Sequence, residues 1–231
     1  MWLIAKYKST TLFSLKESNA TSKGAKSLIV PSQYAIKLTI INSFIQKYSI
    51  KKLEKNFCWI KSLEILVKSS CDIVVNNCFL RIQTLSRGNK NEYQSTVAFR
   101  EYVYLNNPIY IAINIDKLDN EKVNILKSVL VHINYFGKRG CFFQIIPDIK
   151  GNFFKEKDNL DYGYGQKLDK TNYLTSLLYE LDDFGQKIHK FSQVNNYKKD
   201  KTDRNRIKYC FPYELKSSSR KYYHYQMLNE D

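Results

Sequence analysis

The stretch Ile109-Tyr110-Ile111-Ala112-Ile113-Asn114-Ile115 decides the fold, because isoleucine returns at every second position. A period of two is typical of a β-strand with one face turned towards a hydrophobic core. A short polar turn follows this strand, and the next segment predicts a helix, since four apolar residues recur on one of its faces. These residues are Val123, Leu126, Leu130 and Ile133.

Further elements appear on working outward from this strand. Residues 1–8, 63–67 and 141–146 predict three more strands from their β-prone and partly alternating residues. Ser32 predicts the N-cap of a helix, whose apolar face continues to residue 48. Residues 9–30 are rich in Ser, Thr and Lys and predict a basic loop or hairpin.

Residues 76–105 predict a long β-hairpin, because β-prone flanks enclose a polar tip at residues 86–91. The order strand, helix, strand, hairpin, strand, helix, strand then gives the βαββαβ pattern of a ferredoxin-like α+β fold. In that fold both helices cover one face of the sheet, and the other face is free for a ligand, as in RNA-recognition modules. We expect such a domain over residues 1–150 and a C-terminal subdomain or extension over residues 151–231.

The charge of the chain indicates an anionic partner. Against 22 Asp and Glu stand 37 Lys and Arg, which gives a net charge of +15 over 231 residues. Nucleic acid, an anionic membrane surface and an acidic protein all fit this charge. The 18 Tyr and 13 Phe offer stacking surfaces for single-stranded RNA or DNA, although an AT-rich genome also produces many tyrosines. No basic amphipathic helix and no long apolar run favours a membrane.

The cysteines predict neither a zinc site nor any other cofactor. None of them forms a Cys-x-x-Cys pair, and no histidine stands beside them at ligand spacing. Buried, reduced thiols in a cytoplasmic protein are the expectation. The five cysteines are Cys58, Cys71, Cys78, Cys141 and Cys210.

The segment Gly137-Lys138-Arg139-Gly140 is the sharpest candidate for RNA binding. Its glycines allow a close approach of the backbone to a ligand, and Lys138 and Arg139 suit contact with phosphates. A solvated basic turn is the alternative. Arg100 is a further candidate, and it should point to the opposite face of its strand from Glu101.

Other basic residues lie on or near the hairpin. Arg81, Arg87 and Lys90 are candidates for RNA contact from this hairpin, while the two at its tip are also consistent with full solvation. The basic run Lys198–Lys208 is expected to be a solvated loop.

Five short motifs occur in an order that resembles one known family. The chain resembles the Cas-five family of CRISPR-associated proteins, in the RAMP superfamily, and most of all its forms in type I-A and I-B effector complexes. The motifs are Trp2-Leu3-Ile4-Ala5, Phe13-Ser14-Leu15, Pro31-Ser32, Phe99-Arg100-Glu101-Tyr102 and Gly137-Lys138-Arg139-Gly140.

This resemblance implies a single-copy, non-catalytic subunit of Cascade, a ribonucleoprotein complex of antiviral defence or RNA-guided DNA targeting. The subunit would bind the 5′ handle of the CRISPR RNA and cap the backbone filament. Its protein partners would be the adjoining backbone subunit and the large subunit, with target DNA near the protospacer-adjacent motif as a further contact. The hairpin at residues 76–105 would be the thumb of the family.

The alternative function is a metal-independent endoribonuclease that processes the precursor RNA, as one branch of this family does. Such cleavage needs a general base near a 2′-hydroxyl and a cation near the scissile phosphate. The candidate bases are His132, His189 and His224. His132 lies in an apolar run and is expected to be helical and structural, and no pair among the three has a spacing that favours catalysis.

Overall fold

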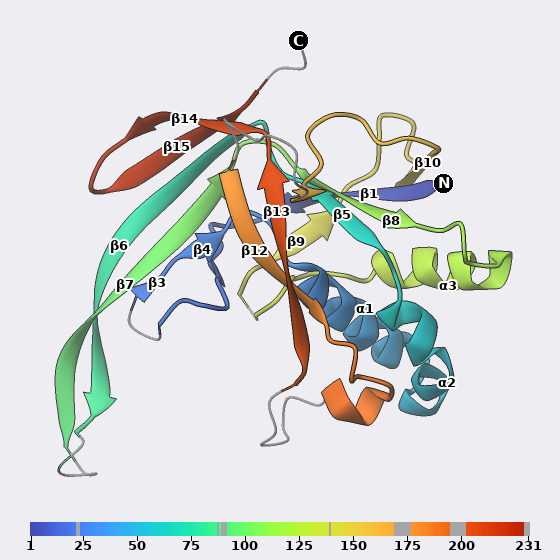
Figure 1. Ribbon diagram of the computed structural model, residues 1–231, viewed down its shortest axis with the longest axis horizontal. Coiled ribbons are helices and arrows are strands. Elements are labelled where there is room, and N and C mark those ends of the chain that lie inside the picture. The colour runs from blue at the N-terminus through green and yellow to red at the C-terminus, as the bar shows by residue number, and fades with distance from the viewer. Residues whose placement is uncertain are drawn as a thin grey trace.

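The computed structural model describes residues 1–21, 24–86, 88, 92–138, 140–168, 177–194 and 202–228. In this part of the chain, helices are combined with mostly antiparallel sheets, so the α+β class expected from the sequence is confirmed. Figure 1 shows the helices gathered at one side of the molecule and a long hairpin reaching away at the other.

Each helix begins at a polar side chain that accepts a hydrogen bond from a backbone N–H group of the first turn. Ser32, which the sequence predicts as an N-cap, accepts from Ala35. Asp119 accepts from Lys122 in the same way, and Ser49 caps a helix that the sequence analysis did not predict. The helices are α1 (Gln33–Lys47), α2 (Ile50–Lys61) and α3 (Asn120–Leu130).

A sheet with the strand order β10-β1-β8-β5 forms the centre of the protein, and β9 pairs with the end of β1. Neighbouring strands in this sheet are antiparallel. The alternating isoleucines of β8 are buried, as predicted, because they face the main hydrophobic core. The strands are β1 (Trp2–Ser9), β5 (Ile65–Lys68), β8 (Ile109–Asn114), β9 (Phe143–Ile145) and β10 (Phe154–Lys157).

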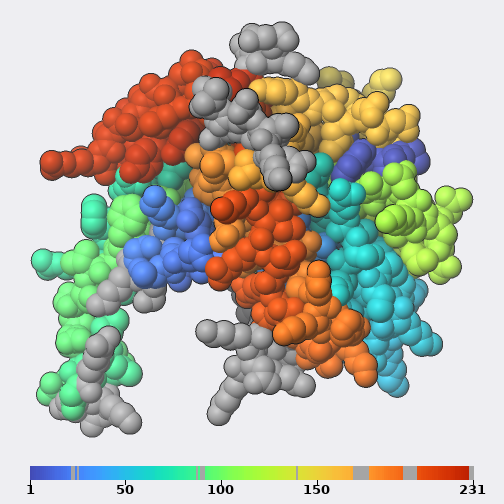
Figure 2. Space-filling model, in the orientation of Figure 1, coloured from blue at the N-terminus to red at the C-terminus, as the bar shows by residue number. Residues whose placement is uncertain are grey.

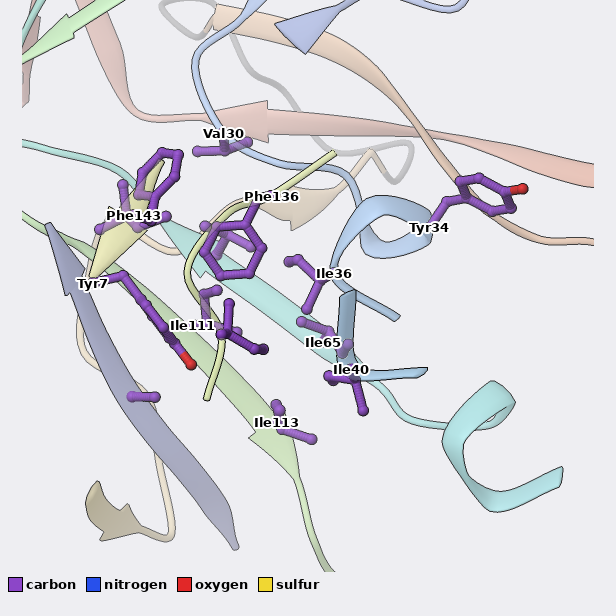
Figure 3. Packing of buried hydrophobic residues seen from close by; sticks show 14 of the residues in the cluster. Tyr7, Val30, Tyr34, Ile36, Ile40, Ile65, Ile111, Ile113, Phe136 and Phe143 are labelled. Atoms are coloured by element: carbon purple, nitrogen blue, oxygen red, sulfur yellow. The ribbon is translucent and has the colours of Figure 1, made fainter. Parts of the chain in front are cut away.

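The main hydrophobic core lies between this sheet and the helices, as Figure 3 shows. The rings of Tyr7 and Phe136 meet edge to face with centroids 5.1 Å apart, and Phe143 packs against Phe136 at 5.2 Å. The buried Tyr7 hydroxyl donates to the carbonyl of Leu130 at the end of α3 (2.8 Å), and burial raises the pKa of this phenol far above its usual range. This cluster fixes Phe136, the residue just before the Gly137 turn.

A second sheet has the order β14-β15-β6-β7-β3 and carries the long hairpin. Strands β6 and β7 pair continuously from Ile73 and Leu105 to Leu85 and Tyr93, and we call this hairpin the thumb. The strands of the second sheet are β3 (Gly24–Ala25), β6 (Asp72–Leu85), β7 (Tyr93–Leu105), β14 (Tyr213–Ser218) and β15 (Tyr222–Met227).

The C-terminal part of the chain joins both sheets and adds a third. Strand β10 pairs with β1, and β15 pairs with β6. The third sheet has the order β11-β13-β12, and its strand β12 packs on α1, where the rings of Phe184 and Tyr34 lie 5.1 Å apart. Its strands are β11 (Gln166–Lys167), β12 (Leu177–Phe184) and β13 (Arg204–Phe211), with a 3-10 helix, η1 (Phe191–Val194), between the last two.

One expectation about this region and one about the cysteines need correction. The end of the basic run Lys198–Lys208 is not a loop, because Arg204–Phe211 forms β13, while residues 195–201 lie outside the described residues. The basic segment 9–30, expected to be a loop or hairpin, does contain a short antiparallel pair, β2 (Leu15–Lys16) with β4 (Ser27–Leu28), and β3 runs parallel to β7. All five cysteines are free thiols, but only Cys141 and Cys210 are buried.

Candidate nucleic-acid interface

The Gly137 turn projects from the core at the end of a tight loop. The N–H of Phe136 donates to the carbonyl of Cys141 at 3.1 Å, and the N–H of Cys141 donates to the carbonyl of Lys138 at 3.2 Å. Phe136 and Cys141 are buried, so they anchor the loop and leave Lys138 exposed at its tip.

The two glycines of this turn adopt backbone angles that other residues avoid. Gly137 has a φ of +72° and Gly140 a φ of +100°, both in the left-handed region that favours glycine. A side chain at Gly137 would also place its Cβ 2.8 Å from Cδ2 of Leu15. Gly137 is therefore required for packing, which differs from the free approach to a ligand expected from the sequence, whereas Gly140 faces open space.

A groove of about 300 Å³ runs beside this turn, and three cationic side chains line it. Lys138 comes from the turn, Lys16 from β2 and Arg204 from β13. Lys16 and Lys138 are exposed and form no ion pair with any described residue. Asp182 is the carboxylate in the groove, so the lining keeps a positive balance that suits phosphate oxygens.

Arg204 is held in place by two contacts. Its guanidinium lies over the ring of Tyr34, 4.2 Å from the centroid, and donates to Asp182 at 2.9 Å. The buried Asp182 also accepts a hydrogen bond from the hydroxyl of Ser18, at 2.5 Å, so the same carboxylate fixes the segment that carries Lys16. The groove is therefore preorganised by contacts between segments far apart in the sequence.

The sequence analysis did not select Arg204 or Lys16. A signal for Arg204 was present, since Arg204, Arg206 and Lys208 alternate with Asn205, Ile207 and Tyr209, which is typical of a strand with one charged face.

The thumb presents a second candidate surface. Phe79 of β6 faces Phe99 of β7, with ring centroids 5.4 Å apart, and 73% of Phe79 is exposed. Exposed aromatic rings cost free energy in water and are the surfaces on which bases stack. Arg81 lies two residues further along β6, on the same face as Phe79 and exposed. In Figure 2 the lower part of the thumb stands apart from β13, with an open gap between them.

Arg100 and Glu101 lie on opposite faces of β7, as the alternation of a strand predicts. Glu101 is buried and accepts a hydrogen bond from the backbone N–H of Ser27 at 2.7 Å. Arg100 is half-buried and donates to the carbonyl of Phe99 at 2.7 Å. Because Arg100 pairs with Cys78 and Arg81 pairs with Val97, the two arginines point to opposite faces of the thumb.

Glu101 gives a prediction for stability. Burial raises the pKa of this carboxyl above its usual value, although the Ser27 N–H and the charge of Lys26 act in the opposite direction. Because its pKa is higher in the folded than in the unfolded state, this carboxyl contributes to the stability of the folded protein at low pH. That contribution is lost as the pH rises through the pKa of the folded state. Glu101→Gln is therefore expected to gain stability relative to the wild-type protein from about pH 4 to about pH 7.

Urea unfolding at the two pH values measures this difference. Glu101→Leu is the control, since it also removes the titrating carboxyl but leaves the buried Ser27 N–H without an acceptor, so it should be about 1–3 kcal/mol less stable than Glu101→Gln at both pH values. A Glu101→Gln variant whose stability difference is the same at both pH values would contradict the prediction.

The structure brings together only part of the predicted site. Lys138, Gly137 and Gly140 form the turn beside the groove, whereas Arg81 and Arg100 belong to the thumb. Arg87, Lys90 and Arg139 lie outside the described residues.

The three histidines lie on separate elements. His132 is exposed just beyond α3, 3.4 Å from the ammonium of Lys47, so it is not part of the helix, contrary to the expectation. His189 is exposed before η1, and His224 of β15 lies 3.4 Å from Asp72. In the described part of the chain, no three His, Cys, Asp or Glu side chains come together to hold a metal ion. No helix among the described residues is long and apolar enough to cross a membrane.

Comparison with known proteins places CRISPR-associated proteins among the structural neighbours. No protein-family model and no curated protein matches the chain. A CRISPR protein from Archaeoglobus fulgidus is 10% identical, with a TM-score of 0.45 over 99% of this chain and 92% of that one.

Two further neighbours come from CRISPR complexes. A chain of the Csm3-Csm4 subcomplex in the type III-A CRISPR-Cas interference complex is 12% identical, with a TM-score of 0.41 over 96% of this chain and 92% of that one. A chain of a CRISPR RNA-guided surveillance complex is 11% identical, with a TM-score of 0.40 over 91% and 88%. At these TM-scores and identities the likeness carries no argument about function.

Proposed function

We propose that this protein is a non-catalytic, RNA-binding subunit of a type I CRISPR effector complex, and that it holds the 5′ handle of the CRISPR RNA. The ordered motifs that resemble the Cas-five family support this proposal. The strand order β10-β1-β8-β5, with α1 and α3 contributing to the core on one side of the sheet, supports a ferredoxin-like βαββαβ core. The observation that carries the proposal is the groove lined by Lys16, Lys138 and Arg204.

The groove and the thumb suit different parts of a single strand of RNA. The groove offers two lysines without ion pairs and a guanidinium fixed by Tyr34 and Asp182, which match phosphate oxygens. The thumb offers the exposed ring of Phe79 for a base and the cation of Arg81 for the backbone. We propose that the handle follows both surfaces and that the adjoining backbone subunit and the large subunit complete its enclosure.

Charge reversal in the groove tests the proposal. The double variant Lys16→Glu/Lys138→Glu is expected to weaken binding of handle RNA by about tenfold or more, because it replaces two phosphate contacts with repulsion. The slope of log K against log salt should become shallower by about 1.4, since each lost contact with single-stranded RNA removes about 0.7. Fluorescence anisotropy with labelled RNA at several salt concentrations measures both quantities.

The matched control is Lys117→Glu/Lys150→Glu, which changes the net charge equally at exposed positions outside the groove. It should weaken binding only slightly and leave the slope near its original value. Equal losses in both double variants would contradict the assignment of the groove.

The non-catalytic part of the proposal has its own test. The isolated protein, incubated with repeat RNA and a chelator, is expected to leave the RNA intact, because His132, His189 and His224 lie on separate elements. Gel electrophoresis of the labelled RNA reports the result. A discrete product that disappears in a His132→Ala, His189→Ala or His224→Ala variant would establish the endoribonuclease instead.

A further inference from the structure

The central sheet has an open face, which the main core does not use. Along β1 the side chains of Leu3, Ala5 and Tyr7 belong to the main core, so Ile4 and Lys6 point to the opposite side. The pairing register continues this face across the sheet. Lys6 lies opposite Tyr110 of β8, and Tyr110 lies opposite Lys68 of β5. Ile4 lies opposite Lys155 of β10.

The segment that follows β10 covers part of this open face. Tyr164 packs with Ile4 and Ala112 in a small second core, and the N–H of Gly165 donates to the carbonyl of Val67 at 3.0 Å. Gly163 has a φ of +99°, and a Cβ there would lie 2.8 Å from Cε of Lys68. The covering segment is thus fitted closely against the sheet and forms one wall of a pocket.

The pocket has a volume of about 410 Å³, and its charge is dominated by lysines from three strands of the central sheet. Asp161, which pairs with Lys157 at 2.8 Å, is its carboxylate. Lys68 donates to the carbonyl of Tyr162 at 2.5 Å. Lys6 and Lys155 form no ion pair with any described residue, so two cations remain to bind an anion. The lysines are Lys6, Lys68, Lys155 and Lys157.

The remaining lining suits a flat apolar group beside the anion. The ring of Tyr110 is half-buried, and the ammonium of Lys6 lies 5.9 Å from its centroid. Burial, together with the nearby Cys71, raises the pKa of Tyr110, so its phenol stays protonated and neutral at physiological pH. Ile4 and Pro108 add apolar surface, and Asn107 adds an amide. The volume exceeds that of a phosphate ion and lies in the range of pockets for small ligands.

We propose that this pocket binds a nucleoside monophosphate unit, with the phosphate between Lys6 and Lys155 and the base against Tyr110. The site is separate from the groove at Lys138 and does not depend on the function proposed for that groove. The unit can come from a free nucleotide or from one position of an RNA strand, and both share the chemistry of a phosphate beside an aromatic base.

Isothermal titration calorimetry of the full chain with AMP, adenosine and inorganic phosphate tests the proposal. AMP is expected to bind, inorganic phosphate to compete with it, and adenosine to bind at least about tenfold more weakly, because it lacks the charged partner of the lysines. Absence of AMP binding, or equal binding of AMP and adenosine, overturns the proposal.

Variants locate the site. Lys6→Gln/Lys155→Gln should weaken AMP binding about 100-fold, since each lysine contributes about tenfold, whereas Lys117→Gln/Lys150→Gln should have no effect. Tyr110→Leu should weaken AMP about tenfold and leave inorganic phosphate unchanged. Equal losses in the two double variants overturn the assignment.

A short oligonucleotide distinguishes the two sources. An RNA pentamer that competes with AMP and loses affinity in Lys6→Gln/Lys155→Gln identifies an RNA strand as the source. A pentamer that does not compete, while AMP binds, identifies the free nucleotide. The groove variant Lys16→Glu/Lys138→Glu should bind AMP as the wild-type protein does. The pocket and the groove can therefore be tested separately, and a negative result for one does not decide the other.

Discussion

Lys37→Met is expected to lower the free energy of unfolding by about 3 kcal/mol, the largest loss that we predict for a single side chain. The Lys37 side chain is 3% exposed, and its ammonium lies 2.8 Å from a carboxylate oxygen of Asp183. It also donates to the carbonyl of Lys61 at 2.8 Å, so one side chain joins α1, the end of α2 and β12. Methionine fills similar space but leaves Asp183 and this carbonyl without their cation, and Asp183 is only 21% exposed.

The pKa of Lys37 shows how closely the two charges depend on each other. Burial lowers the pKa of this ammonium, while the neighbouring Asp183 acts to raise it. Removal of both charges, in Lys37→Met/Asp183→Leu, should therefore recover much of the lost stability, because no unpaired buried charge remains.

Urea unfolding followed by circular dichroism measures these changes. The matched control is Lys122→Met, which breaks the exposed ion pair with Asp119 on α3 and should cost less than about 1 kcal/mol. A Lys37→Met variant as stable as this control would contradict the role of Lys37 in joining the helices to β12.

The parts of the fold that could be predicted from the sequence are those specified by neighbouring residues. The alternation of Ile109 to Ile115 identified β8, and Ser32 identified the start of α1. The same local information was present for α2, where Leu53, Phe57 and Ile60 recur at helical spacing after the cap at Ser49. This helix was missed because its apolar pattern is short and most of its other positions are polar. The signals that specify it, a cap and apolar residues at helical spacing, are the same as for α1.

The candidate site was less predictable, because it depends on contacts between distant segments. Lys16, Lys138 and Arg204 meet only after β12 packs on α1 and Asp182 fixes both Ser18 and Arg204. The local pattern did identify the Gly137 turn, since a Lys between glycines is visible in the sequence.

The faces of the thumb show a related limit. Whether Arg81 and Arg100 share a face depends on the register of β6 against β7, and a shift of one residue would reverse the answer. Sequence alternation alone could separate Arg100 from Glu101, which are neighbours on one strand. It could not relate two arginines on different strands, whose register is set by the loop between them.

Phe79→Ala is expected to weaken binding of handle RNA by about 5- to 150-fold, which is the range for loss of one stacked base. Phe79 is 73% exposed, so the substitution should change the free energy of unfolding by less than about 0.5 kcal/mol. Its ring lies 5.4 Å from that of Phe99, tilted by 60°, so one face remains available for a base. Fluorescence anisotropy with labelled handle RNA measures the affinity.

Two variants separate stacking from a general loss of apolar surface. Phe79→Trp keeps a flat ring and should retain the affinity, whereas Phe153→Ala removes an exposed ring, 39% exposed, outside the thumb and should have no effect. If Phe79→Ala keeps full RNA affinity but no longer assembles with the neighbouring subunit, the exposed ring is a protein contact and the stacking role is wrong. Arg81 lies on the same face, so under that outcome Arg81→Gln should also keep its RNA affinity and fail to assemble. If the face binds RNA instead, both variants should lose RNA affinity. Only Arg81→Gln should then make the affinity less dependent on salt, because it removes a phosphate contact.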